Sequence, residues 1–583
     1  MCAIAGVVYL YRDALHHDIE KMINDMKHRG PDDLGFFFDQ KIALGQSRLA
    51  VIDIQGGKQP MLSSDGNLVL VFNGEIYNYK DLMFSLQEKG IVFKTQSDSE
   101  VLLHLYEQYG SQMMMMLNGM FSFAIYDKRN NEIFIARDRL GVKPLYIYQK
   151  NGLFAFASEL QGLFSLSEIR SNLSLNHDAL WHYFSLLYVP PPKTIFQEIS
   201  VFPAGSYGYV RNGILELEAY WSPIILEPSS ESASLDVYLD TARKLINTSV
   251  SLRMQSDVPY GAFLSGGVDS SLVVGAMATA SHEPVKTFTA RIQDEELDEV
   301  SYAAVVADKY KTEHHVLDVG TLDRAVLYKI VSHMGQPFAD SSILPTYLIA
   351  QKIRQFVTVV LGGDGGDELF CGYNKYSKLL TNDSNATVEE AFINRVGEDQ
   401  KNSIFSEEFK ERITEKKTFS ALLQHPWNKE YQGLDLLRFL DITYFLGGDI
   451  LPKLDSLSMA HSLEAREPLL DNALVEFALS LPTSMLVSQH YNKVLLKALV
   501  AREFSDSHAY RQKVGFIIPV SRWLSELLKD GLPEPLFHDI FNQKKVNESL
   551  DRFIKGDQTE TQLLFGYAMF AFWSEWFRSL EKS

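Results

Sequence analysis

The sequence predicts two domains, a layered α+β domain followed by an α/β domain built on a parallel sheet. Three observations predict this division. The first half alternates short apolar strands with turn residues, and the second half places glycines and acids directly after apolar strands. Between the halves, residues 223–235 lose all periodicity, which is typical of a linker. At 583 residues the chain is long enough for at least two such domains.

The strands that define the first domain are the apolar runs 68–72 and 121–126, which lead into the turn residues 73–74 and 127. A helical pattern covers about 99–109 between them. Strands that alternate with helices indicate a layered arrangement. We expect this domain over residues 2–215 and the linker over 216–235.

The second domain begins its pattern with an apolar strand at 259–264, which ends in glycines and leads into a helix from about Asp269. A second apolar strand, 357–361, also leads into glycines and acids. Long helical segments make up most of the rest. Apolar strands between helices are typical of a parallel sheet covered on both faces, so 236–583 is predicted to be an α/β domain.

Composition narrows the functional classes. The net charge of −19 argues against general binding to nucleic acid or anionic membranes. The two cysteines, Cys2 and Cys371, are far apart, which excludes a disulfide framework and suits a reducing compartment. The amino terminus lacks the basic region of a signal peptide, and the apolar run 563–574 is too short to span a bilayer. We expect a cytoplasmic protein with no nucleic-acid or membrane partner.

Cys2 is a candidate nucleophile because it follows the initiator methionine. A small second residue permits removal of Met1, and the thiol would then lie beside a free α-amino group with a pKa of about 8. Nucleophile and base would share one residue, as in enzymes with an amino-terminal threonine. The alternative is a chance cysteine at a frayed terminus.

The run 265–271, Ser-Gly-Gly-Val-Asp-Ser-Ser, predicts a site for phosphates. Glycines at a strand-to-helix turn let main-chain amides approach a ligand, and the amino-terminal end of the helix favours anions. The run has no lysine of the Walker A type, and Asp269 adds a carboxylate where a magnesium pyrophosphate would lie. The alternative is an ordinary glycine-rich turn with Asp269 in the first helical turn.

The run 362–368, Gly-Gly-Asp-Gly-Gly-Asp-Glu, repeats this arrangement after the second strand. The carboxyl ends of parallel strands meet at one edge of a sheet, so Asp269, Asp364 and Asp367 are expected to converge there. Three acids beside phosphates require a hard cation such as Mg²⁺. The alternative, that these acids only cap a helix, needs one acid rather than three.

Positive groups for the phosphates are expected from Lys493 and Lys513, with Lys497 and Arg511 as competitors. Each of them, taken alone, is more often a solvated surface charge. His314 and His315 do not predict a metal site, because adjacent side chains on a strand point to opposite faces.

Taken together, the motifs resemble the glutamine-dependent asparagine synthetase family over nearly the whole chain. In the first half they are residues 28–32, 47–53, 73–78, 97–100, 137–146 and 157–160. In the second half they are residues 265–271, 337–342, 458–466, Lys493 and 513–516. The resemblance implies a class II glutamine amidotransferase domain, an αββα sandwich with an amino-terminal nucleophile, followed by an ATP-pyrophosphatase domain of the parallel-sheet type.

The resemblance also implies residue roles in the first domain. Cys2 would be the nucleophile, and the Asn73 side chain and Gly74 amide would form the oxyanion hole. Arg48 would pair with the glutamine carboxylate, which a guanidinium binds in bidentate fashion. Asp98 would hold the glutamine amino group. The residues implied in glutamine binding are Arg48, Val51, Asn73, Gly74, Glu75 and Asp98.

In the second domain the resemblance implies that Asp364 and Lys493 act in catalysis and that Asp269 and Asp367 hold Mg²⁺. The residues implied in ATP binding are Leu264, Ser265, Gly266, Gly267, Asp269, Ser270, Ala290, Gly362 and Gly363. The sequence departs from the family pattern at Ala3, Gly362, Ser456 and Ile517, where glycine, serine, arginine and glycine, respectively, are usual. It also has Asp364 where the best-studied bacterial synthetase carries glutamate.

The expected reaction joins glutamine hydrolysis to amide synthesis. Ammonia from glutamine would attack a carboxylate that MgATP has adenylated, with aspartate as the expected acceptor and AMP and pyrophosphate as products. The same chemistry with another carboxylate is the first alternative, and an inactive nucleotide-binding scaffold is the second. Family members are often homodimers, so a homodimer is also expected.

Overall fold

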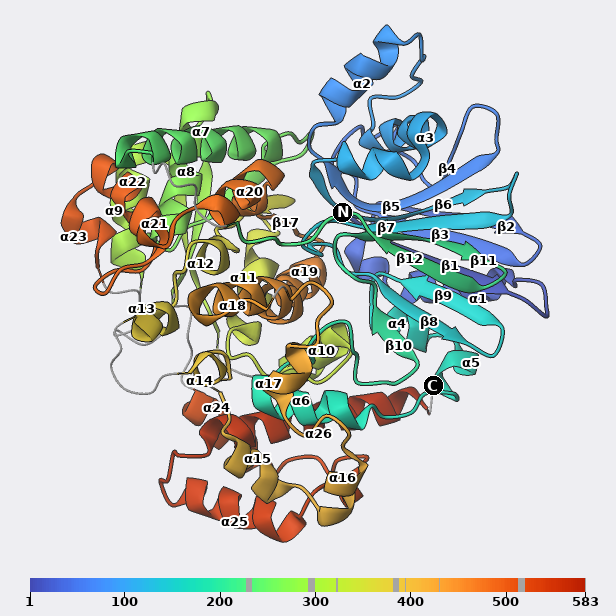
Figure 1. Cartoon of the computed structure of the whole chain (residues 1–583). Helices are drawn as coiled ribbons and strands as arrows, with labels where there is room; N and C mark the ends of the chain where they lie inside the picture. The colour runs from blue at the N-terminus through green and yellow to red at the C-terminus, as the bar shows by residue number, and fades with distance from the viewer. Residues whose placement is uncertain are drawn as a thin grey trace.

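The computed structural model describes residues 1–226, 233–291, 299–320, 323–380, 387–393, 395–428, 430–511 and 520–581. Figure 1 shows two lobes side by side, with the amino terminus where they meet. The first lobe is rich in strands. The second holds a smaller sheet surrounded by helices.

The first domain contains two six-stranded sheets in which every pair of neighbours is antiparallel. The first sheet has the order β10-β8-β9-β1-β3-β2, with β1 Cys2–Tyr9, β2 Asp33–Asp39, β3 Ile42–Arg48, β8 Tyr146–Lys150, β9 Leu153–Ala157 and β10 Ile199–Val201. The second has the order β12-β11-β7-β6-β5-β4, with β4 Met61–Leu62, β5 Leu68–Ile76, β6 Gly119–Asp127, β7 Glu132–Arg137, β11 Ser206–Arg211 and β12 Ile214–Ala219.

Four layers result because both faces of each sheet are covered. Ile4 and Val8 of β1 pack against the other sheet, whereas Ala5 faces the outer core with helices α1 (His16–Asp25) and α4 (Leu160–Phe164). Helices α2 and α3, which are Tyr79–Glu88 and Asp98–Tyr109, cover the outer face of the second sheet. The expected αββα sandwich is confirmed.

Two expectations differ from the structure at the edges of elements. Asn73 and Gly74 lie inside β5, paired with Ser122 and Phe121 of β6, so the expected turn at 73–74 is wrong. The strand continues because both its faces are buried, and tertiary packing overrides the local turn preference. The second sheet also continues through β12 to Ala219, beyond the boundary expected at 215.

The second domain is organised around a parallel sheet of order β15-β14-β13-β16-β17. Its strands are β13 Tyr260–Phe263, β14 Lys286–Arg291, β15 Glu313–Asp318, β16 Val359–Leu361 and β17 Glu464–Arg466. On one face Val359 and Leu361 share a core with α8 (Val268–Ala280) and α9 (Val300–Tyr310). On the other face Val360 packs with α11 (Ile343–Ile353) and α19 (Leu451–Met459). The parallel sheet covered on both faces is thus confirmed.

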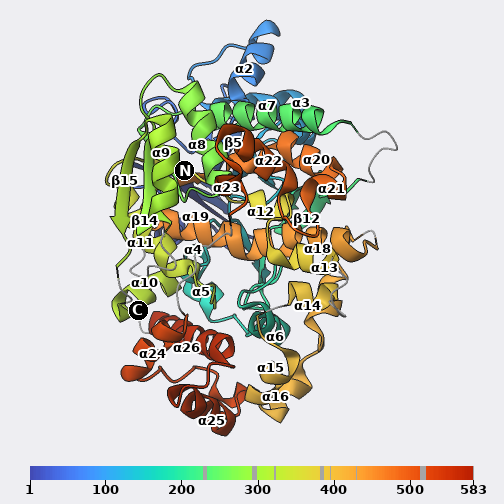
Figure 2. The same ribbon diagram turned by 90° about the vertical axis from the view of Figure 1, so that its left-hand side faces the viewer.

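Figures 1 and 2 both show helices α24, α25 and α26 at the base of the molecule. Helix α26, Thr561–Leu580, holds the apolar run 563–574 and buries it. No helix in the described part of the chain is long and apolar enough to cross a membrane. The remaining helices are η1 Lys27–Arg29, η2 Gly110–Met115, α5 Ser167–Arg170, α6 His177–Leu186, α7 Leu235–Arg253, α10 Arg324–Met334, α12 Gly366–Leu369, α13 Asn374–Leu380, α14 Val388–Phe392, α15 Glu398–Ile404, α16 Glu407–Arg412, α17 Thr418–Leu422, α18 Gly433–Leu440, η4 Asp441–Ile450, η5 Pro468–Leu470, α20 Asn472–Ser480, α21 Thr483–Leu486, α22 Val494–Glu503, α23 Asp506–Ala509, α24 Val520–Lys529, η6 His538–Ile540 and α25 Gln543–Ile554.

Candidate active sites

Cys2 lies at the start of β1, where it joins the two sheets of the first domain. It is the cross-strand neighbour of Arg48 on β3, and its amide N–H donates to Asn73 Oδ1 of β5 at 3.0 Å. Burial raises the pKa of the thiol, while the amino-terminal ammonium and Arg48 act in the opposite direction. Both charges favour the thiolate, which is the nucleophilic form.

The predicted oxyanion donors meet beside Cys2. In the described part of the chain, Asn73 Nδ2 is buried and has no hydrogen-bond partner, so it remains available to a ligand. Gly74 approaches the next strand so closely that a Cβ atom would lie 2.0 Å from the Met120 carbonyl oxygen. Only glycine fits that position, which explains why the amide expected in the oxyanion hole belongs to a glycine.

Arg48 is occupied by main-chain oxygens. Its guanidinium donates to the carbonyls of Ile52, Asp53 and Ile54 at 3.1, 2.8 and 2.9 Å. These bonds use three of its five N–H groups and hold the loop that follows β3. The glutamine carboxylate would therefore have to bind to the two N–H groups of Arg48 that these bonds do not use.

The other residues implied in glutamine binding are buried near this site. Asp98 begins α3, and its Oδ2 accepts a hydrogen bond from the Ile76 amide at 3.0 Å. Burial raises the pKa of Asp98 to about 6. Burial, and then the nearby Glu464, raise the pKa of Glu75 well above its usual value. Val51 is buried, and its carbonyl accepts the Asp257 amide of the second domain at 2.9 Å.

Buried ion pairs join the two domains next to Cys2. The Met1 ammonium donates to Glu464 Oε2 at 2.7 Å and to the Leu49 carbonyl at 3.3 Å. Burial alone would raise the pKa of Glu464, but the ammonium and Arg466 outweigh it and lower that pKa to about 2. Arg29 also crosses the junction, because it pairs with Asp455 of α19 at 2.8 Å. No sequence pattern predicts the contact with Glu464, because it depends on how the two domains pack.

The second site is a cavity of about 550 Å³ at the carboxyl edge of the parallel sheet. The turn after β13 is braced by Ser265, whose Oγ accepts the Gly267 amide at 3.2 Å and lies 3.1 Å from Ser270 Oγ. Gly266 has a φ of +68°, and a Cβ atom there would lie 2.4 Å from the main chain of Tyr302. Glycine is therefore required for this turn to pack against α9.

The two glycine-rich turns lie side by side because β13 and β16 are neighbours in the sheet. A Cβ atom on Gly363 would lie 2.7 Å from Cβ of Asp269. Asp269, Asp364 and Asp367 all line the cavity, as the strand order predicts.

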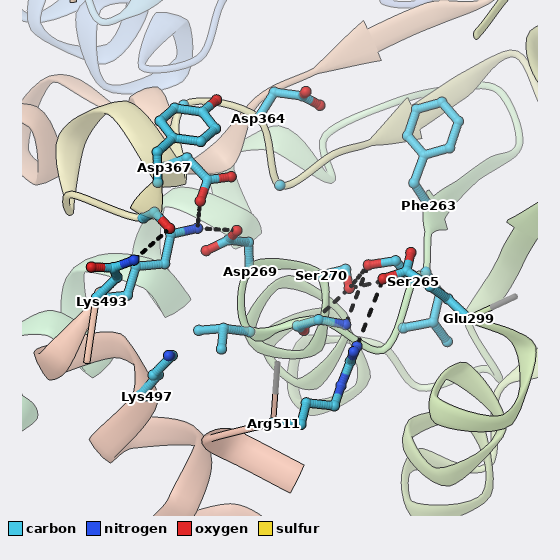
Figure 3. A pocket seen from close by; sticks show the side chains of 18 of the residues that line it. Phe263, Ser265, Asp269, Ser270, Glu299, Asp364, Asp367, Lys493, Lys497 and Arg511 are labelled. Atoms are coloured by element: carbon cyan, nitrogen blue, oxygen red, sulfur yellow. Dashed lines mark hydrogen bonds and ion pairs between the residues drawn. The ribbon is translucent and has the colours of Figure 1, made fainter. Parts of the chain in front are cut away.

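Lys493 reaches between two of these acids. Its ammonium forms ion pairs with Asp269 and with Asp367, the latter at 2.9 Å (Figure 3). Two of the acids therefore already bind a cation, the Lys493 ammonium. Carboxylate oxygens are the ligands that Mg²⁺ prefers, so the side chains of Asp269 and Asp367 fit the ion that the resemblance implies.

Residues 241–575 match the family model described as asparagine synthase, and residues 1–221 match that of a glutamine amidotransferase domain. The chain belongs to the asparagine synthase family. Its members are glutamine-hydrolysing ligases that use ATP. We therefore call the two halves the amidotransferase domain and the synthase domain.

Three proteins of Bacillus subtilis (strain 168) are similar to the chain. Glutamine-hydrolyzing asparagine synthetase 1 is 32% identical over 577 residues, with 91% of this chain and 89% of that protein covered. Asparagine synthetase 2 is 31% identical, with 88% and 72% covered. Asparagine synthetase 3 is 28% identical, with 94% and 93% covered.

The cavity of the synthase domain contains most of the residues implied in ATP binding. Those that line it are Leu264, Ser265, Gly267, Asp269, Ser270, Ala290 and Gly363. Gly266 and Gly362 shape the two turns without lining the cavity. Lys493, Lys497 and Arg511 do line it, whereas Lys513 and Ile517 lie outside the described residues.

Sequence reasoning missed further residues of the cavity. Glu299 lines it and pairs with Arg511 at 3.8 Å (Figure 3). Glu368 lines it too, and burial, followed by the charge of Asp367, raises the pKa of Glu368 to about 7. Glu368 was within the acidic run, and its type alone could have indicated it; Glu299 has no such signal.

The histidine pair at 314–315 has separate partners. His314 Nδ1 lies 3.0 Å from Thr287 Oγ1, and the His315 ring stacks on Phe288. Within the described residues, one other group has the geometry of metal ligands: His28, Glu159 and His333, whose ligand atoms lie within 4.8 Å of one another. Arg29 binds the Glu159 carboxylate at 2.9 Å, which makes that group a poor cation site.

Proposed function

We propose that the chain transfers ammonia from glutamine to an adenylated carboxylate, with L-aspartate as the acceptor and L-asparagine as the product. One observation carries this proposal. A buried thiol with an oxyanion donor that has no partner among the described residues and a cavity of acids and lysines occur in one chain, and the buried ion pair between Arg29 and Asp455 joins their domains.

The first half-reaction would take place at Cys2 once Met1 is removed. The thiolate attacks the side-chain amide of glutamine, and the negative charge on the amide oxygen is stabilised by Asn73 Nδ2 and the Gly74 amide. Collapse of this intermediate expels ammonia and leaves a thioester, which water hydrolyses to glutamate. The amine of Cys2 would accept the thiol proton and give it to the leaving nitrogen.

The second half-reaction would take place in the synthase cavity. The amides of the turn 265–267 and the start of α8 would bind the phosphates of ATP. Asp269 and Asp367 would hold Mg²⁺, which neutralises the charge on the leaving pyrophosphate. Lys493 would then turn from these acids to the phosphates. The acceptor carboxylate attacks the α-phosphorus, because a free carboxylate is too weak an electrophile for ammonia.

The choice of acceptor depends on the region around Asp364. This acid lines the cavity beside the nucleotide turns, at the position where the best-studied bacterial synthetase has the longer glutamate. The named relatives support aspartate. The second candidate is another carboxylate, which the shorter side chain of Asp364 favours because it leaves more room.

A screen of carboxylates for glutamine-dependent AMP release tests the acceptor. Each assay holds the purified enzyme, MgATP, glutamine and one carboxylate, and both AMP and amide are measured. We expect aspartate to give the highest kcat/KM. If aspartate gives no AMP while another carboxylate does, the acceptor is wrong but the chemistry stands. If no carboxylate gives AMP, the chain is an inactive scaffold.

We also propose that the enzyme acts in the cytoplasm. Both cysteines, Cys2 and Cys371, are free thiols in the structure. A reducing compartment would keep Cys2 in the form that the proposed mechanism needs. Fractionation of the producing cells, with the enzyme followed by antibody, would test this location; recovery outside the cytoplasm would contradict it.

A further inference from the structure

We propose that Lys453 and Asp340 form the subsite that binds the α-carboxylate and the α-ammonium group of the acceptor, so that the synthase domain selects an amino acid. The inference rests on the proposed function, because it requires that a carboxylate is adenylated in the synthase cavity. It goes further by naming the side chains that distinguish aspartate from other carboxylates of similar size.

The leaving group determines the side of the cavity from which the acceptor approaches. In a displacement at phosphorus, the attacking and leaving oxygens lie roughly in line. Pyrophosphate would leave on the side of Asp269 and Asp367, where Mg²⁺ is proposed to bind and where Lys493 now lies. Figure 3 shows that the side chain of Asp364, which also lines the cavity, points away from Lys493. We therefore expect the acceptor on the side of Asp364.

Lys453 lies beside this part of the cavity. It belongs to α19, and the next residue of that helix, Leu454, lines the cavity. Burial alone would lower the pKa of Lys453, but the charges of Asp340 and Asp449 outweigh it and raise that pKa. Asp364 acts in the same direction, which places its charge near the Lys453 ammonium. A charged ammonium group is therefore close to the side from which the acceptor would approach.

The described residues do not use every donor of the Lys453 ammonium. Its Nζ donates to Asp340 Oδ1 at 3.1 Å and to Asp449 Oδ1 at 3.3 Å, which are two acceptors for three N–H groups. The Lys453 side chain is only 9% exposed, so a third N–H group without an acceptor is unfavourable. A carboxylate of the acceptor, bound in the adjoining cavity, would supply that third partner.

Asp340 provides the negative charge of the subsite. It precedes α11, where Thr346 lines the cavity. Its Oδ1 accepts the Ser342 amide at 2.9 Å as well as Lys453, whereas its Oδ2 accepts from Arg395 at 3.2 Å. Burial alone would raise the pKa of Asp340, but Lys453 and Arg395 outweigh it and lower that pKa. The carboxylate therefore keeps its charge, and its Oδ2 has the capacity to accept a further hydrogen bond from an ammonium group.

Adjacent opposite charges match the two charged groups that an α-amino acid carries on one carbon. Lys453 would bind the α-carboxylate, and Asp340 would bind the α-ammonium group. An acceptor that lacks either group would leave a buried charge of the subsite without its partner. A site built in this way discriminates strongly against such analogues. The subsite would therefore exclude simple carboxylates that the cavity could otherwise hold.

The test compares three acceptors that share the reacting carboxylate. Aspartate carries both charged groups, succinate lacks the ammonium group, and β-alanine lacks the α-carboxylate. AMP release is measured with full-length enzyme, glutamine and MgATP, and kcat/KM is obtained for each acid. We expect wild type to favour aspartate over each analogue by about 10²-fold or more, because each analogue leaves a buried polar group unpaired.

Two variants then assign each charge of the subsite to one group of the acceptor. For Lys453→Met, kcat/KM for aspartate should fall about tenfold or more, mainly through KM, because a hydrogen bond between charged groups is lost. The value for β-alanine should fall less than about threefold, since this acid has no α-carboxylate for the lysine to bind. Asp340→Asn should affect aspartate in the same way but leave succinate nearly unchanged. The KM for ATP should stay within about twofold of wild type in both variants.

Lys401→Met is the matched control. Lys401 is another buried lysine of the synthase domain, pairs with Glu398 at 2.9 Å and does not line the cavity. This variant should keep the wild-type ratios of kcat/KM among the three acids. A purely structural role of Lys453 or Asp340 would instead lower kcat/KM equally for every acid.

The inference is overturned if wild type uses succinate or β-alanine as well as it uses aspartate, or if the two variants keep the wild-type ratios among the acids. If Lys453→Met does not fold, the ratio of aspartate to succinate in Asp340→Asn decides, and an unchanged ratio overturns the inference. A different α-amino acid as the best acceptor would contradict the proposed acceptor but support the subsite. A wild type that releases no AMP with any acid would contradict the proposed function itself.

Discussion

The two sites of this chain are built in different ways. In the amidotransferase domain, strand register fixes the partners: Cys2 lies opposite Arg48, and Asn73 projects from the interior of β5. In the synthase domain, the acids lie on turns after β13 and β16, and their partner Lys493 is 224 residues from Asp269 in the sequence.

This difference determines what each site does before a ligand binds. In the amidotransferase site, Asn73 Nδ2 is a buried donor that has no hydrogen-bond partner among the described residues. In the synthase site, the acids that would hold Mg²⁺ are already paired, because the Lys493 ammonium binds both of them. We infer that the first site binds its substrate with little rearrangement and that the second must exchange one cation for another.

The largest expected effect is that of Cys2→Ala. Without the nucleophile, glutamine-dependent amide synthesis should fall by about 10³-fold or more, while ammonium-dependent synthesis stays within about twofold. Steady-state assays with each nitrogen source measure both rates. Glutamine-dependent synthesis that survives in this variant would show that the site at Cys2 does not supply the nitrogen.

The next largest effect is expected for Asp367→Asn. This change removes a proposed metal ligand, so pyrophosphate release should fall by about 10²-fold or more with glutamine hydrolysis unchanged. Binding of Mn²⁺ in the presence of ATP, followed by electron paramagnetic resonance, should weaken in parallel. Wild-type affinity for Mn²⁺ would mean that Asp367 is not a ligand.

Asn73→Ala tests the oxyanion donor that the strand register leaves available. Loss of one such donor typically costs about 10²-fold in kcat, with little change in KM. Glutamine hydrolysis should show this pattern, and ATP-dependent reactions with ammonium should not change. An increase in KM alone would assign Asn73 to substrate binding rather than to the oxyanion hole.

The smallest effect concerns pH. Burial raises the pKa of Asp98 to about 6, so its carboxylate gains a proton as the pH falls through 6 and loses its attraction for the glutamine amino group. The KM for glutamine should then rise about tenfold for each pH unit below 6. Asp98→Asn should show a higher KM that no longer depends on pH in this range. A wild-type KM that stays constant between pH 7 and 5 would contradict the assignment.

The sequence predicted those parts of the fold and sites that depend on local pattern. The apolar strand at 259–264 and the glycines after it are enough to predict a phosphate-binding turn, and the strand order predicts that Asp269 and Asp364 lie close together. The local preference of Asn73 predicts a turn. Nothing in the sequence indicates that the strand holding it is buried on both faces and continues past it.

Contacts across the domain junction were beyond prediction. Glu464 lies 463 residues from Met1 in the sequence, and nothing in either segment marks them as partners. The bonds from Arg48 to the carbonyls of the next loop were also unexpected, since main-chain acceptors leave no trace in the residue types.

The central claim is that Cys2 becomes the first residue when Met1 is removed, and that its thiol releases the nitrogen that the synthase domain uses. Intact-protein mass spectrometry on purified enzyme with full glutamine-dependent activity tests this claim most directly. The account predicts a mass that lacks Met1. A fully active preparation in which every molecule retains Met1 would contradict it.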